Sequence, residues 1–151
     1  HSTGAGAIVW SCHIDTRCKA ALAQDGWYEP IPPDVLSTPL QQPIMLMQSE
    51  TTTWQRDNIK RLADLYQTAR ADVYHLKLTG VQHLDFSDYP LFGPHSLLLS
   101  NRGTLDGART VQVIDSYLLA FFDKYLKNEP ASLLNGPSPD FPEVQFESHS
   151  P

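Results

Sequence analysis

A nearly continuous apolar run, from Pro43 to Gln48, most constrains what this chain can fold into. A strand with apolar residues at successive positions buries both of its faces, which is typical of a parallel strand covered by helices on either side. Two further short runs, Lys19–Gln24 and Asp72–Leu78, lie before and after it. We predict that these three segments are strands of one sheet.

Segments with helical character separate and follow these strands. Residues 3–13 are small and mostly apolar, which suits a helix packed closely against a sheet. Within Ile59–Tyr66, apolar residues recur at positions i, i+3, i+4 and i+7, the spacing of one helical face. A wide apolar stripe predicts a last helix over 108–126, ended by Pro130. Strands alternating with helices predict an α/β fold with a parallel sheet.

Length and charge limit the classes of protein. At 151 residues the chain is long enough for one hydrophobic core. Its formal net charge of −6 argues against a nucleic acid partner. No apolar run has the length of a transmembrane helix. We predict that residues 1–128 belong to one α/β domain, and that residues 129–151 form a Pro/Ser-rich tail that need not be ordered.

The first residues, His1-Ser2-Thr3-Gly4, match the later part of a G-x-S-x-G nucleophile elbow. The first glycine of that motif would precede His1, so we expect the chain to be the C-terminal part of a longer protein. Asp25 follows the first predicted strand and His83 follows the third. The order Ser, Asp, His is the order that α/β-hydrolases use.

These three residues have the chemistry of a catalytic triad. All three are expected at the carboxyl ends of parallel strands, where active sites of open α/β sheets form. A serine hydroxyl needs a base to take its proton, and a histidine oriented by a buried carboxylate supplies one. Each residue also has an ordinary alternative: Ser2 as a solvated residue, Asp25 as a turn residue before glycine, and His83 as a loop histidine. Their order along the chain favours the triad.

Four segments resemble one known family. They are HSTGA at the elbow, KAALAQDGW around the acid, PIMLMQSE in the second predicted strand, and LTGVQHLDFSD around the histidine. Together they resemble the platelet-activating-factor acetylhydrolase and related bacterial esterase branch of the α/β-hydrolases. The resemblance implies the C-terminal portion of an α/β-hydrolase fold, with a parallel sheet and flanking helices.

The resemblance also implies roles for individual residues. Ser2 would be the nucleophile, Asp25 the acid and His83 the base, while the backbone amide of Thr3 would be one oxyanion donor. The second donor would come from a segment before the elbow. Many α/β-hydrolases carry the acid one strand later, which makes Glu50 the alternative acid.

Other residues near the expected site have two readings each. Trp27, Tyr28 and Phe86 flank the acid and the base, where they either pack in the core or line an apolar acyl pocket. Asp85 and Asp88 lie so close to His83 in sequence that we expect them to shape its loop. The six histidines form no H-x-H or H-x-x-x-H pair, so we expect no metal site.

Two further features of the sequence each have two interpretations. Cys12 and Cys18 are either free thiols or one bridge, since two cysteines are too few for a disulfide framework. The apolar stretch Tyr89–Leu99 either packs under the last helix or makes peripheral contact with lipid.

The sequence therefore predicts a serine ester hydrolase that works through an acyl-enzyme and needs no cofactor. Expected substrates are short-acyl esters or the acyl groups of phospholipids. A polyester- or lipase-type hydrolase and a non-catalytic ligand-binding protein of the same fold are the alternatives.

Overall fold

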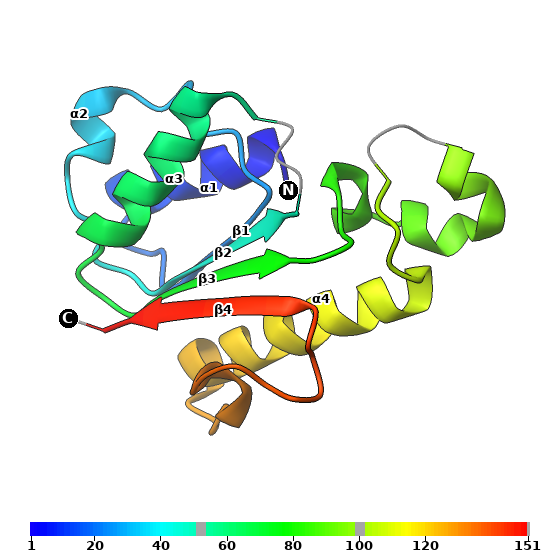
Figure 1. The fold of residues 1–151 in the computed structure, drawn as a ribbon. Helices are drawn as coiled ribbons and strands as arrows, with labels where there is room; N and C mark the ends of the chain where they lie inside the picture. Colours follow the sequence, from blue (N-terminus) through cyan, green and yellow to red (C-terminus); the bar gives the residue numbers. More distant parts are fainter. Residues whose placement is uncertain (51–53, 99–101, 151) are drawn as a thin grey trace.

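The computed structural model describes residues 1–50, 54–98 and 102–150, without the side chains of 94–98. Within these ranges one sheet of four strands runs through the molecule in the order β1-β2-β3-β4 (Figure 1). The strands are β1 (Ala21–Gln24), β2 (Ile44–Ser49), β3 (Val73–Leu78) and β4 (Val144–His149). The first three are parallel, and β4 pairs antiparallel with β3 at the edge. The predicted parallel sheet is thus confirmed for the three predicted strands.

Helices cover both faces of the sheet (Figure 1). On one face lie α1 (Thr3–Ile14), α2 (Pro33–Leu36) and α3 (Arg56–Thr68), and on the other lies α4 (Gly107–Phe122), which continues as a π-helical turn, η3 (Asp123–Lys127). Short 3₁₀ segments complete the described elements: η1 (His83–Phe86), η2 (Tyr89–Leu98) and η4 (Ser132–Leu134).

Strand β2 shows why the central apolar run is nearly continuous. Ile44 and Leu46 are buried in the core on the side of α1 and α3. Met45 and Met47 alternate with them and are buried in the core on the side of α4. Both faces of the strand are therefore removed from water, as the sequence predicted.

Residues 129–151, treated above as a tail, contribute both η4 and β4. Val144 and Phe146 contact the core on the α4 side, while Gln145 is exposed on the opposite face of the strand. Such alternation of buried and exposed side chains is typical of an antiparallel edge strand. Just before β4, Glu143 forms an ion pair with Arg109 of α4, with Nε and Oε1 2.7 Å apart. The sequence analysis did not predict β4.

A disulfide joins Cys12, near the end of α1, to Cys18, before β1. This decides between the two readings that the sequence left open. The bridge closes the connection between the helix that follows Ser2 and the strand that precedes Asp25. It therefore fastens the two elements that carry two of the predicted site residues.

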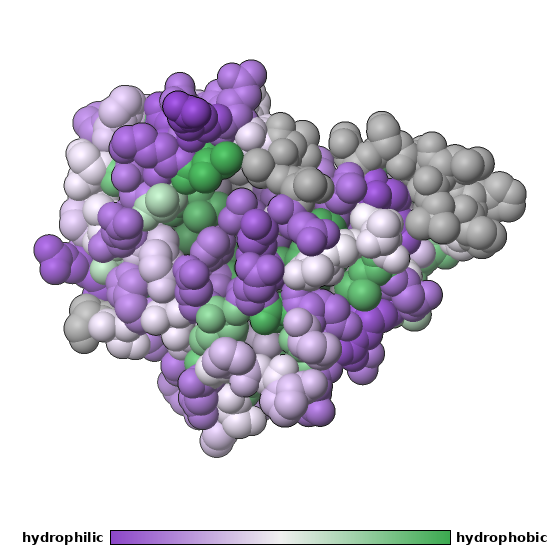
Figure 2. Space-filling model, in the orientation of Figure 1, coloured by the Kyte–Doolittle hydropathy of each residue, from purple (hydrophilic) through white to green (hydrophobic). Residues whose placement is uncertain are grey.

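The surface in Figure 2 is mostly hydrophilic, with small groups of apolar side chains between the elements. Across the described part of the chain, no helix combines the length and the apolarity that crossing a bilayer requires.

Candidate active site

Ser2, Asp25 and His83 lie at the carboxyl ends of the parallel strands. Asp25 follows β1 directly, and its backbone amide donates to the carbonyl of Met47 in β2, with N and O 2.8 Å apart. His83 is the first residue of η1, which follows β3. Ser2 precedes α1, and its amide donates to the carbonyl of Gln24, with N and O 3.0 Å apart. The end of β1 thereby fixes the position of Ser2.

The three side chains form one continuous hydrogen-bonded chain. The Ser2 Oγ lies 3.1 Å from Nε2 of His83. The other ring nitrogen, Nδ1, lies 2.6 Å from Oδ2 of Asp25. Because a carboxylate only accepts, the proton between them is on Nδ1, and the lone pair of Nε2 faces the serine hydroxyl. This is the tautomer that a general base requires.

The carboxylate of Asp25 is held from its other side as well. Its Oδ1 accepts hydrogen bonds from the Oγ and the backbone amide of Ser49, at 2.9 and 3.1 Å. The side chain of Asp25 is completely buried, and that of His83 is 13% exposed. Asp25 is therefore fixed in one orientation and shielded from water, while the imidazole remains within reach of a substrate.

Ser2 has the backbone of a sharp strand-to-helix turn. Its φ of 59° and ψ of −123° are unusual for a residue with a side chain. A close approach of α1 to the segment after β1 accompanies this turn: a Cβ on Gly6 would lie 2.1 Å from the carbonyl oxygen of Trp27. Strain of this kind is a feature of functional turns, and a nucleophile elbow needs small residues for close packing.

Thr3 is the first residue of α1, so its backbone amide has no acceptor within the helix. The amide also lies at the positive end of the helix dipole, next to Ser2. Both properties suit a donor to a developing oxyanion. The role of Thr3 as such a donor stays a prediction.

Glu50, the alternative acid, makes different contacts. Its Oε2 accepts a hydrogen bond from the amide of Gly80 at 2.8 Å, and its own amide donates to the carbonyl of Val81 at 2.9 Å. Among the described residues, the carboxylate bonded to His83 is that of Asp25. Glu50 instead fastens the loop that leads to His83.

The structure adds Trp54 to the aromatic residues that the sequence singled out near the site. Trp54 lies edge-on to His83, with ring centroids 5.2 Å apart, and its Nε1 donates to the carbonyl of Asp25 at 3.1 Å. Its ring is parallel to that of Trp27, at a centroid distance of 6.2 Å. Trp54 was missed because it follows β2 outside any recognised motif. Its one sequence signal is its place in the loop at the carboxyl end of a predicted strand.

Tyr28 and Phe86, the other two aromatic residues considered for the pocket, lie in different surroundings. Tyr28 is 0% exposed, so of its two interpretations the structure favours packing in the core. Burial also raises the pKa of its hydroxyl. Phe86 is largely buried beside the site, with its ring 6.2 Å from that of His1, which in turn lies 4.5 Å from His83.

Comparison with known proteins agrees with this geometry. A family model described as platelet-activating factor acetylhydrolase, isoform II, matches residues 1–133. The chain belongs to this family. The acetylhydrolase resemblance drawn from four short segments is thereby confirmed.

Individual relatives give the same result. Platelet-activating factor acetylhydrolases of Gallus gallus and Cavia porcellus are 23% and 27% identical over 128 residues, which is 83% of this chain and 30% and 29% of those proteins. A solved ferulic acid esterase from Streptomyces cinnamoneus matches with a TM-score of 0.81 and 28% identity, over 97% of this chain and 44% of that one. The predicted α/β-hydrolase fold is confirmed. The chain spans less than half the length of these relatives.

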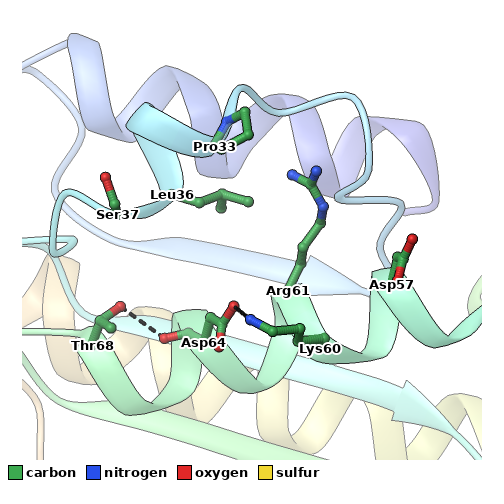
Figure 3. A pocket seen from close by; sticks show the side chains of 8 residues that line it. All are labelled: Pro33, Leu36, Ser37, Asp57, Lys60, Arg61, Asp64 and Thr68. Atoms are coloured by element: carbon green, nitrogen blue, oxygen red, sulfur yellow. Dashed lines mark hydrogen bonds and ion pairs between the residues drawn. The ribbon is translucent and has the colours of Figure 1, made fainter.

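The acetylhydrolase fold also carries a cavity away from the triad (Figure 3). It has a volume of about 500 Å³ and lies between α2 and α3. Charges of both signs line it, including Arg61 and the ion pair between Lys60 and Asp64. None of the three triad residues contributes to its walls.

In the described part of the chain, no group of three or more His, Cys, Asp or Glu side chains is arranged to hold a metal ion.

The stretch expected either to pack under α4 or to contact lipid forms η2 over Tyr89–Leu98. Leu91 and Phe92 are 59% and 62% exposed. Leu99 lies outside the described residues. Lipid contact by this stretch stays a prediction.

Proposed function

We propose that the protein containing this chain is a serine carboxylic-ester hydrolase that works through an acyl-enzyme. One observation carries the proposal: Ser2, His83 and Asp25 are joined by hydrogen bonds of 3.1 and 2.6 Å in the orientation that activates a serine. Membership of the acetylhydrolase family supports it. Ser2 is the nucleophile, His83 the general base and Asp25 the residue that orients His83.

In the first half of the reaction, Ser2 Oγ attacks the ester carbonyl while Nε2 of His83 takes its proton. The tetrahedral oxyanion is stabilised by the amide of Thr3 and by further donors. The imidazolium then gives its proton to the departing alkoxide, and the acyl group stays on Ser2. Asp25 stabilises the imidazolium without itself taking the proton.

In the second half, a water molecule takes the place of the alcohol. His83 removes a proton from the water molecule while the oxygen of the water attacks the acyl carbonyl. Collapse of the second tetrahedral intermediate releases the carboxylic acid and returns the proton to Ser2. These steps need no cofactor.

We infer that the substrates are short-acyl esters or acyl groups of phospholipids. The names of the two acetylhydrolase relatives and of the esterase neighbour support an ester substrate. The indole ring of Trp54 beside His83, with that of Trp27 stacked parallel to it, supplies an apolar wall, which suits an uncharged acyl or alcohol group. The same wall also fits the alternative of a polyester- or lipase-type hydrolase. A non-catalytic binding protein is disfavoured, because ligand binding alone gives no reason to hold serine, histidine and aspartate in this hydrogen-bonded chain.

The test is Ser2→Ala in the full-length protein, assayed with p-nitrophenyl acetate. Turnover should fall by about 10⁴-fold or more, because the acyl-enzyme cannot form without the serine hydroxyl. Ser11→Ala is the matched control, since Ser11 is an exposed serine of α1, and it should keep full activity. A Ser2→Ala protein with a tenth of the wild-type turnover would overturn the proposal.

A further inference from the structure

Two residues beyond His83, the chain buries a carboxylate that the proposed reaction does not use. Asp85 has a side chain that is 0% exposed, and it faces Arg102, whose side chain is 3% exposed. Its Oδ1 accepts a hydrogen bond from Nη1 of Arg102. Its Oδ2 accepts from the backbone amides of Gln82 and Gly103, at 2.8 and 2.7 Å. Burying such a pair costs desolvation energy, so a gain in stability alone is a weak reason for it.

The histidine stands on a turn that needs external support. His83 is the first residue of η1, a 3₁₀ segment of four residues. Hydrogen bonds in 3₁₀ segments have poorer geometry than those in α-helices. Asp85 strengthens the turn by closing a capping box with Gln82. Its remaining bonds leave the turn and reach the segment before α4, at Arg102 and Gly103.

That segment is packed against both ends of the loop that carries His83. The amide of Leu105 donates to the carbonyl of Gly80 at 2.9 Å, just before the turn. A Cβ on Gly103 would lie 2.0 Å from the same carbonyl oxygen and 2.6 Å from Oδ2 of Asp85. Only glycine permits this approach. The loop from Gly80 to Asp85 is therefore fastened at both ends to residues 102–105.

We propose that Asp85 is a positioning residue for the hydrolytic reaction. Through Arg102 and Gly103 it holds the turn of His83 in the one place where Nε2 reaches Ser2 Oγ and Nδ1 reaches Asp25. Asp85 acts through the backbone of this turn, because Asp25 already occupies Nδ1. The proposal rests on the proposed function, since it assigns a role within the same site.

The test compares Asp85→Asn with Glu143→Gln in the full-length protein. Both changes neutralise a carboxylate that is paired with an arginine, but Glu143 pairs with Arg109 of α4, between that helix and β4. Each is expected to lower the melting temperature. Asp85→Asn should also lower kcat for p-nitrophenyl acetate by about 10²-fold, the cost of a displacement of about 1 Å in a catalytic group. KM should stay within about twofold, because the displaced group is the base.

Glu143→Gln should leave both kinetic constants unchanged at temperatures well below its melting point. If Asp85→Asn loses stability but keeps kcat within about twofold of wild type, Asp85 is structural only and the proposal is overturned. Should Asp85→Asn fail to fold, Arg102→Gln tests the same link, because the two backbone amides still bind Asp85. In that variant kcat should fall by about tenfold with KM unchanged, and an unchanged kcat would also overturn the proposal.

The outcome is separable from that of the proposed function. If Ser2→Ala keeps its turnover, the proposed function fails, whatever Asp85→Asn does. If Ser2→Ala is inactive and Asp85→Asn matches wild type, only the positioning role fails.

Discussion

Replacement of Asp25 by asparagine should change the tautomer of His83 while hardly changing the shape of the site. In the structure, Oδ1 of Asp25 accepts two hydrogen bonds from Ser49, and Oδ2 accepts one from Nδ1 of His83. With Asp25→Asn, the amide oxygen of the new side chain keeps the donors of Ser49. Its NH₂ group then faces Nδ1, which must become an acceptor. The ring proton moves to Nε2, where it faces Ser2 and prevents His83 from taking the serine proton.

The size of the loss follows from this geometry. The carboxylate is completely buried, so water cannot replace it as the acceptor for Nδ1–H. Reversal of the tautomer costs about 10⁴-fold in kcat, or about 5 kcal/mol in activation free energy. KM should change little, because the carboxylate of Asp25 is completely buried and out of reach of the ester. The assay is hydrolysis of p-nitrophenyl acetate by the full-length protein, with a thermal melt to show that the variant is folded.

Glu50→Gln is the matched control. The oxygen of its side chain can still accept the hydrogen bond from Gly80, so the loss should be far smaller. If Glu50→Gln instead lost about 10³-fold or more while Asp25→Asn remained active, the acid would be Glu50 and the reasoning about the tautomer would be refuted.

Three further outcomes are expected. Replacing both Cys12 and Cys18 by serine should lower the free energy of unfolding by about 2 kcal/mol in denaturant titrations, because a short closed loop is released, and should leave kcat unchanged. Trp54→Ala should raise KM for an aromatic ester by about threefold to tenfold, whereas Trp10→Ala on the exposed side of α1 should not, since only the former ring lies at His83. The hydrogen bond from its arginine partner lowers the pKa of Glu143 below the ordinary value of 4.5. The stability that this glutamate contributes is therefore present at pH values above its ordinary pKa and is lost as the pH falls. The difference in melting temperature between wild type and Glu143→Gln should accordingly shrink from neutral pH to about pH 3.

The strands that carry the site could be predicted because their sequence pattern and their environment agree. β2 is apolar at successive positions and is buried on both faces, so one simple pattern defines it. The same holds for α1, whose small residues follow Ser2 and permit close packing. Once strands alternate with helices, the carboxyl ends of the strands must lie on one edge, which brings Ser2, Asp25 and His83 together.

Strand β4 could not be predicted for a physical reason. It is an antiparallel edge strand with one face exposed, so its apolar positions are few and its segment resembles an irregular tail. Its position depends on long-range contacts, such as the ion pair between Arg109 and Glu143, that no local pattern reveals. The position of Tyr28 stayed open in the sequence for a similar reason: an aromatic residue next to an acid has the same local signal whether it faces the core or a pocket.

Trp54 and Arg102 show the same limit at the site. Both lie far from His83 in the sequence, and both reach its surroundings only because of the fold: Trp54 packs edge-on to His83, and Arg102 binds Asp85 in the same turn. Asp85 was expected to shape the loop of His83, because it lies two residues away. Its partner on the other segment becomes apparent only when the fold is known.

Covalent labelling tests the central claim most directly. The full-length protein is treated with diisopropyl fluorophosphate, and the modified residue is located by peptide mass spectrometry. An activated serine predicts loss of esterase activity in proportion to one phosphoryl group per chain, with that group on Ser2. Complete inactivation with the label on another residue, or full labelling of Ser2 with activity retained, would contradict the account.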